Sequence, residues 1–204
     1  MSSIVVQEFI TLDGVAQAPG GPEEDPESNF EHGGWSMDYD AKYGSPDDGE
    51  FIIEWERKTE ALLLGRKTYD IWAGAWGVWD ENAEGLEGEL TRIYNRVPKY
   101  VASRTLTELG WKNSHLLGDD VADAVAALRA EPGGEIRVWG STDLIRTLAE
   151  HDLVDEYRLM VYPIVLGTGK KLFSDGFALT NLTLAESRPL ASGVIVNTYR
   201  RREA

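Results

Sequence analysis

The segment that most constrains the fold is an apolar run, residues 61–64, that stops at a glycine followed by two basic residues and a threonine (Gly65, Arg66, Lys67 and Thr68). Residues 69–72 continue with helical spacing, so the pattern predicts a buried strand that enters a helix through a tight turn. Such a turn directs backbone N–H groups, a hydroxyl and two cations at one point. The sequence therefore predicts a phosphate site at residues 65–68.

Length and composition limit the kinds of protein this can be. The 204 residues fit one domain, expected to span residues 1–204. The formal net charge of −15 argues against a nucleic-acid partner. The chain has no cysteine, no membrane-length apolar run and no signal-peptide pattern, and its three histidines have no metal-ligand spacing. We therefore expect a cytoplasmic protein without a metal site or a membrane partner.

Two further strand ends share the character of the first turn. Ser103 and Arg104 follow an apolar run, and Gly140, Ser141 and Thr142 follow another. In an open α/β sheet, ligands bind outside the carboxyl ends of the strands. Three such turns side by side could hold a dinucleotide, although each alone is more often an ordinary connection between a strand and the next helix.

Strand and helix patterns alternate along most of the chain, which predicts parallel strand pairing through right-handed crossovers. The last two strands predict an antiparallel edge on a mixed sheet. Residues 15–48, rich in Gly, Pro, Asp and Glu, are expected to form a long functional loop or lid. Besides the turn at residues 65–68, we expect strands at 4–10, 99–103, 116–117, 136–139, 154–162, 179–186 and 194–201, and helices over 49–60, 80–95, 121–128 and 144–148.

Together these blocks resemble the dihydrofolate-reductase superfamily, most closely the branch that contains the reductase domain of riboflavin biosynthesis. The strand-Gly-Arg-Lys-Thr turn is similar to the superfamily's NADPH-binding turn. Residues 11–14 (Thr-Leu-Asp-Gly), 153–156 (Leu-Val-Asp-Glu), 163–169 (Pro-Ile-Val-Leu-Gly-Thr-Gly) and 172–173 (Leu-Phe) resemble blocks of that branch, and residues 31–35 resemble a block of its stand-alone members. The resemblance covers nearly the whole chain and implies a three-layer α/β fold with helices on both faces of a mostly parallel sheet.

The resemblance implies NADPH as cofactor and assigns roles to the turn residues. Arg66 would contact the 2′-phosphate of the adenosine, and Lys67 and Thr68 the pyrophosphate. Ser103 and Arg104 would border the adenosine. Gly65 belongs to the same turn, and the backbone of residues 140–142 would approach the pyrophosphate. The chain departs from the usual Gly-Gly by having Ser141, which is unfavourable at positive φ.

The family's buried proton-donating acid has no clear counterpart. Its region offers four carboxylates, Asp47, Asp48, Glu50 and Glu54. Glu50 and Glu54 lie beside apolar residues and are the better candidates for an acid with a raised pKa, the alternative being a solvated helix carboxylate. Asp13 is a further catalytic candidate, or else an aspartate that forms a turn before glycine.

Aromatic residues could line a substrate site. Trp35 in the long loop is a candidate substrate contact. Trp72, Trp76 and Trp79 could form the wall of a pocket for a flat ring, pack in the core or form a subunit interface.

The resemblance implies an NADPH-dependent reductase that transfers hydride to a small pterin-like or aminopyrimidine-ribose substrate. Because no acid is clearly placed, we expect dihydrofolate itself to be reduced weakly or not at all. The rival interpretation is a non-catalytic nucleotide-binding or interaction protein on the same fold. The resembled branch commonly forms homodimers, and we expect a homodimer here.

Overall fold

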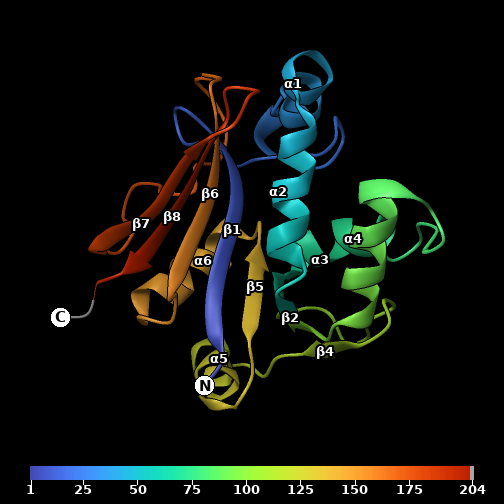
Figure 1. Cartoon of the computed structure of the whole chain (residues 1–204). Coiled ribbons are helices and arrows are strands. Elements are labelled where there is room, and N and C mark those ends of the chain that lie inside the picture. Colours follow the sequence, from blue (N-terminus) through green and yellow to red (C-terminus); the bar gives the residue numbers. More distant parts are fainter. Residues whose placement is uncertain (203–204) are drawn as a thin grey trace.

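The computed structural model describes residues 1–202 and is built on one eight-stranded sheet (Figure 1). The strands lie in the order β4-β3-β2-β5-β1-β6-β8-β7. All neighbouring pairs are parallel except β6–β8 and β7–β8, so the predicted mixed sheet with an antiparallel C-terminal edge is confirmed. The strands are β1 (Ser3–Thr11), β2 (Thr59–Gly65), β3 (Lys99–Ala102), β4 (Ser114–Leu116), β5 (Glu135–Trp139), β6 (Glu156–Tyr162), β7 (Leu182–Pro189) and β8 (Ile195–Arg201).

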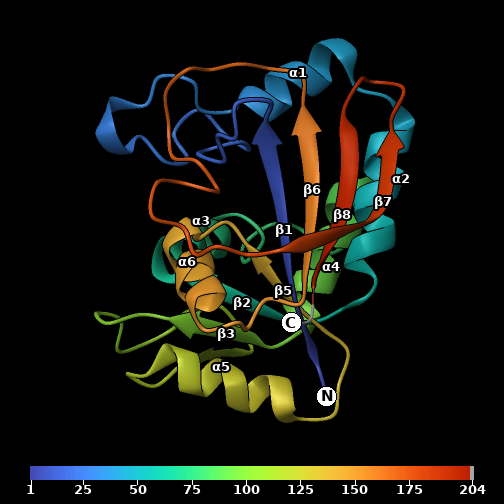
Figure 2. The same ribbon diagram turned by 90° about the vertical axis from the view of Figure 1, so that its left-hand side faces the viewer.

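Helices cover both faces of the sheet, which confirms the predicted three layers (Figures 1 and 2). α5 and α6 pack on one face, and α2, α3 and α4 on the other, while α1 crosses the carboxyl ends of β1 and β6. No helix in the described part of the chain has the length and apolar character needed to cross a bilayer. The helices are α1 (Trp35–Tyr43), α2 (Pro46–Glu56), α3 (Arg66–Gly74), α4 (Gly85–Arg96), α5 (Val121–Ala130) and α6 (Thr142–Glu150).

The central strand β1 is buried on both faces, as expected for a parallel strand between two helical layers. Val6 and Ile10 point toward α5 and α6 and pack with Leu148. Phe9, at a position of opposite parity, packs instead with residues of the α2 side such as Ile52. The two sides of β1 therefore face two different parts of the molecule.

The prediction of a loop at residues 15–48 is only partly right. This stretch contains the short 3-10 helix η1 (Glu27–Asn29), the whole of α1 and the first residues of α2. Its apolar residues are scattered among polar ones, so no periodic pattern indicated α1. Val15, Phe30 and Trp35 are nevertheless buried together against Tyr162 at the end of the sheet. These residues anchor the segment to the core, and its role as a lid stays a prediction.

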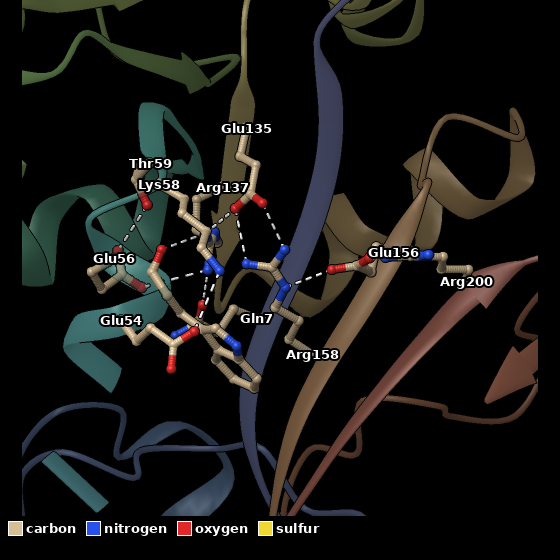
Figure 3. A network of polar contacts seen from close by, with 11 residues as sticks. Gln7, Glu54, Glu56, Lys58, Thr59, Glu135, Arg137, Glu156, Arg158 and Arg200 are labelled. Atoms are coloured by element: carbon tan, nitrogen blue, oxygen red, sulfur yellow. Dashed lines mark hydrogen bonds and ion pairs between the residues drawn. The ribbon is translucent and has the colours of Figure 1, made fainter. Parts of the chain in front are cut away.

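A network of charges that is buried at its centre and ends at the exposed Arg200 joins α2 to the sheet (Figure 3). Arg137 on β5 has no exposed surface, donates to the Trp55 carbonyl at 3.0 Å and lies 3.8 Å from Glu56. Arg158 on β6 donates to both oxygens of Glu135 at 2.7 and 2.8 Å. Three acidic and three basic side chains alternate across the network, which therefore balances its own charge: Glu56, Arg137, Glu135, Arg158, Glu156 and Arg200.

Candidate functional site

A cleft of about 1880 Å³ opens at the carboxyl ends of the central strands. Its walls bring together the three turns that the sequence singled out, after β2, β3 and β5. Single-ligand pockets usually measure about 300–1,000 Å³, so this cleft is large enough for a cofactor and a substrate together. All nine predicted cofactor contacts line it: Gly65, Arg66, Lys67, Thr68, Ser103, Arg104, Gly140, Ser141 and Thr142.

Two helices begin at this cleft without a capping side chain. α3 starts at Arg66 and α6 at Thr142, and neither N-cap residue makes a side-chain hydrogen bond to the first turn. The first N–H groups of a helix have no partner within the helix. The two N-termini therefore present unpaired donors and the positive ends of two helix dipoles to the cleft, an arrangement suited to phosphate groups.

Ser141 connects the two helix N-termini. Its hydroxyl accepts the Gly65 N–H at 2.8 Å and lies 2.8 Å from the Thr68 hydroxyl, so it joins the β2–α3 turn to the β5–α6 turn. Ser141 adopts the left-handed conformation, with φ 62°, next to Gly140 at φ 53°. The strain expected for a serine is therefore present, and the hydroxyl contributes two hydrogen bonds that a second glycine could not make.

Gly65 is required for a different reason. Its φ of −73° suits any residue, but an added Cβ would lie 2.9 Å from the Ser141 hydroxyl oxygen. The glycine that ends the predicted strand is therefore set by the close approach of the second turn and not by its own backbone angles.

Three cations of the cleft, Arg66, Lys67 and Lys170, are paired with carboxylates. Arg66 donates to Asp70 at 2.9 Å, one turn further along α3. Lys67 and Lys170 both contact Glu27, and Lys170 also contacts Asp25. The two lysines hold the pKa of Glu27 at about 2, well below its usual value, chiefly through their hydrogen bonds. The segment of residues 25–27 is thus tied across the cleft to the predicted phosphate-binding turn.

Aromatic side chains form one wall of the cleft. Trp72, Trp76 and Trp79 all line it, and the ring centroids of Trp76 and Trp79 are 4.5 Å apart. Trp72 also packs on Tyr94, with ring centroids 4.8 Å apart. The sequence left three roles open for these tryptophans. Two of them, lining a pocket and packing in the core, both describe this cluster.

The structure corrects the candidate acids. Glu50 and Glu54 are exposed on α2 and do not line the cleft. Adjacent positions on a helix point about 100° apart, so the apolar neighbours Phe51 and Trp55 face the core while the two glutamates face solvent. The buried acid predicted at these positions is wrong, and the solvated alternative is right. Asp47 is also exposed, whereas Asp48 is buried and accepts hydrogen bonds from Ser45 and Ser192.

Asp13 and Trp35 make hydrogen bonds within the fold and do not line the cleft. Asp13 accepts hydrogen bonds from the Thr11 hydroxyl at 2.6 Å and from the Gly167 N–H at 2.8 Å. The Thr11 bond in particular lowers the pKa of Asp13, which makes it a poor proton donor. Trp35 is buried, and its Nε1 donates to the Gln17 carbonyl at 2.8 Å. Neither residue lines the cleft, so the expected catalytic role of Asp13 and substrate contact of Trp35 find no support.

Two acids of the cleft were missed. Glu8 on β1 is 2% exposed, has one carboxyl oxygen without a hydrogen-bond partner, and has a pKa raised well above its usual value by burial. Asp40 on α1 also has one unpartnered buried oxygen, and burial raises its pKa to about 6. An acid inside the apolar run of β1 was a signal for Glu8. No sequence pattern indicated Asp40, because α1 itself was not predicted.

Comparisons with known proteins place this geometry in a family. The model of the RibD C-terminal domain matches residues 2–196. The chain belongs to the RibD C-terminal domain family. The uncharacterized protein YyaP of Bacillus subtilis (strain 168) is 31% identical over 196 residues, covering 96% of this chain and 93% of that protein.

Solved structures agree on the fold. A putative riboflavin biosynthesis protein from Shewanella sp. PV-4 superposes with a TM-score of 0.70 at 21% identity, covering 98% of this chain and 99% of that one. A dihydrofolate reductase from Enterococcus faecalis, solved in complex with NADP(H), gives a TM-score of 0.58 at 12% identity, covering 98% and 97%. The RibD C-terminal assignment confirms the resemblance seen in the sequence, and the chain has the dihydrofolate-reductase-like fold of a reductase-domain family.

Proposed function

We propose that this protein is an NADPH-dependent reductase that transfers hydride to a small pterin-like or aminopyrimidine-ribose substrate. The observation that carries the proposal is the pair of uncapped helix N-termini at α3 and α6, joined by Ser141 and flanked by cations at one cleft. The family and the NADP(H) complex of the Enterococcus neighbour support it. A homodimer in the cytoplasm stays a prediction.

The residues present fit this cofactor. Unpaired N–H groups at residues 66–68 and 142 would hold the pyrophosphate, and Arg66 and Arg104 offer guanidinium groups for the adenosine phosphate. Ser103 would border the adenosine. The bound cofactor supplies the hydride. The chain contributes orientation of the two reactants and a wall of tryptophans that excludes water from them.

The experiment is a titration of the protein with NADPH and with NADH, followed by fluorescence. A charge-assisted hydrogen bond is worth about 1.5–3 kcal/mol, so Arg66→Ala should weaken NADPH binding about 10- to 150-fold and barely change NADH binding. Arg57→Ala is the matched control, because Arg57 is also an exposed arginine paired with a carboxylate but lies outside the cleft. Equal losses for both cofactors would remove Arg66 from this role.

Binding and turnover separate the proposal from its rival. NADPH absorbance would be followed with a panel of pterins and aminopyrimidines. Consumption of NADPH with any of them supports a reductase. Tight NADPH binding without any consumption would favour the nucleotide-binding alternative. Dihydrofolate is expected to be a poor substrate.

A further inference from the structure

The Glu27 carboxylate reaches across the cleft to the turn that the sequence predicted to bind phosphate. It contacts the ammonium groups of Lys67, in the first turn of α3, and of Lys170, in the segment after β6. Among the hydrogen bonds and ion pairs of residues 1–202, the contact with Lys67 is the only one that joins residues 20–34 to α3. Both side chains are about half exposed, so solvent and ligands can reach this ion pair.

Glu27 covers the lysine of the turn but not its other donors. Within the part of the chain that the structure describes, its carboxylate bonds to the two lysines alone, and α3 begins without a capping side chain. The first N–H groups of α3 therefore stay available to an anion. A cofactor phosphate would gain the lysine and these N–H groups together, so it would bind the turn more strongly than Glu27 does.

Lys170 gives Glu27 a second partner. The Lys170 ammonium donates to Asp25 at 2.5 Å and to Glu27 as well. Gln17 holds the backbone of this segment, because its Nε2 donates to the carbonyls of Asp25 and Glu27 at 3.0 and 3.1 Å. If a phosphate took Lys67, Glu27 would keep both Lys170 and Gln17. The contact with Lys67 can therefore be released without leaving the Glu27 charge unpaired.

The contact with Lys67 also differs from the other ion pair of this turn. Arg66 pairs with Asp70, four residues further along α3, which is the common spacing of a local pair on a helix surface. Glu27 lies 40 residues before Lys67 and belongs to a different element, η1. Like charges repel at short range, so a phosphate and the Glu27 carboxylate would not share one ammonium favourably. A phosphate at Lys67 therefore favours the release of Glu27.

We propose that Glu27 is an internal competitor of the cofactor. Its carboxylate occupies the place of a cofactor phosphate on Lys67 and shifts to Lys170 alone when the cofactor binds. The association rate of the cofactor then depends on the fraction of molecules in which Lys67 is free, whereas the dissociation rate does not. This inference rests on the proposed NADPH binding and adds a control of cofactor affinity that lies within the chain itself.

Stopped-flow mixing with NADPH, followed by tryptophan fluorescence, measures both rates. At low salt, Glu27→Gln should bind NADPH about two- to fivefold faster and release it at the wild-type rate, because an effect of this size is typical of an exposed ion pair. The difference should disappear at about 1 M salt, where such pairs are screened. Glu31→Gln is the matched control, because it removes an equal charge nearby and Glu31 is exposed outside the cleft.

Two further measurements separate pairing with Lys67 from a general effect of charge. In Lys67→Met there is no ammonium for Glu27 to cover, so adding Glu27→Gln should change the association rate less than it does in the wild-type background. Inorganic pyrophosphate, titrated by calorimetry, should bind Glu27→Gln about two- to fivefold more tightly than the wild type. The second measurement does not depend on NADPH.

An unchanged association rate would overturn the inference. Faster release of NADPH from Glu27→Gln would also overturn it, because Glu27 would then close over the bound cofactor. The two proposals fail separately. If no variant binds NADPH but Glu27→Gln binds pyrophosphate more tightly, the reductase function is lost and the competition holds for another phosphate ligand. If NADPH is bound and consumed but Glu27→Gln behaves like the wild type, only the competition is lost.

Discussion

Arg137 offers the sharpest test of how this fold is held together. Replacing it with methionine keeps most of the apolar stem but removes the guanidinium group. Glu135 would retain Arg158 as its partner, whereas Glu56 would lose its cation while remaining fully buried. Removing one partner of a buried ion pair costs about 3–5 kcal/mol. For a domain of this size each kcal/mol lowers Tm by about 2–4 °C, so Arg137→Met should lower Tm by roughly 6–20 °C.

The pH dependence follows from Glu56. Burial raises the pKa of Glu56 and the charge of Arg137 lowers it, so removing the arginine raises that pKa further. A carboxyl group whose pKa is higher in the folded than in the unfolded protein destabilises the folded state as pH rises above the unfolded pKa. The loss of unfolding free energy caused by Arg137→Met should therefore be larger at pH 8 than at pH 5, where Glu56 can take up a proton.

Urea unfolding followed by circular dichroism at both pH values measures these effects. Arg137→Met combined with Glu56→Gln should recover much of the loss, because no unpaired charge then stays buried. Arg200→Met is the control, since Arg200 belongs to the same network but its side chain is 67% exposed; it should cost at most about 1 kcal/mol. A loss below 1 kcal/mol for Arg137→Met, or no recovery in the double variant, would refute the reasoning.

Two further predictions concern the cleft. Glu27→Gln should tighten NADPH binding several-fold in a fluorescence titration at low salt, because Lys67 would lose its carboxylate partner and Lys170 would keep only Asp25; weaker binding would mean that the contact of Glu27 with the two lysines supports the site. Asp40→Asn should raise Tm at pH 7.5 and leave it unchanged near pH 3.5, because the folded pKa of Asp40 is raised to about 6 and ionisation costs stability only above the unfolded pKa; an equal shift at both pH values would argue against a titrating Asp40.

Local patterns were sufficient for most of the fold. The apolar run before Gly65 and the helical spacing after it give β2 and α3, since both signals lie within a few residues. The two C-terminal strands were likewise predicted as an antiparallel pair. α1 could not be predicted, because its nine residues lack an apolar period and it is stabilised by contacts with the distant Tyr162.

The site was less accessible to sequence reasoning than the fold. The turns of the cofactor region were found because a strand end, a glycine and a cation are adjacent in sequence. The acids were not, because burial depends on which way a helix faces. Glu54 has apolar neighbours in the sequence, yet its side chain is 62% exposed. Asp40 becomes a candidate only when Tyr162, 122 residues away, is placed beside it.

Because of the Ser141 hydroxyl, the substitutions tolerated at positions 65 and 141, which are 76 residues apart, depend on each other. A side chain at position 65 would occupy the space that this hydroxyl fills, and a glycine at position 141 would vacate that space. Only one of these two positions can therefore carry a side chain. Relatives with glycine at the position of Ser141 should tolerate alanine at the position of Gly65, whereas relatives with serine there should not.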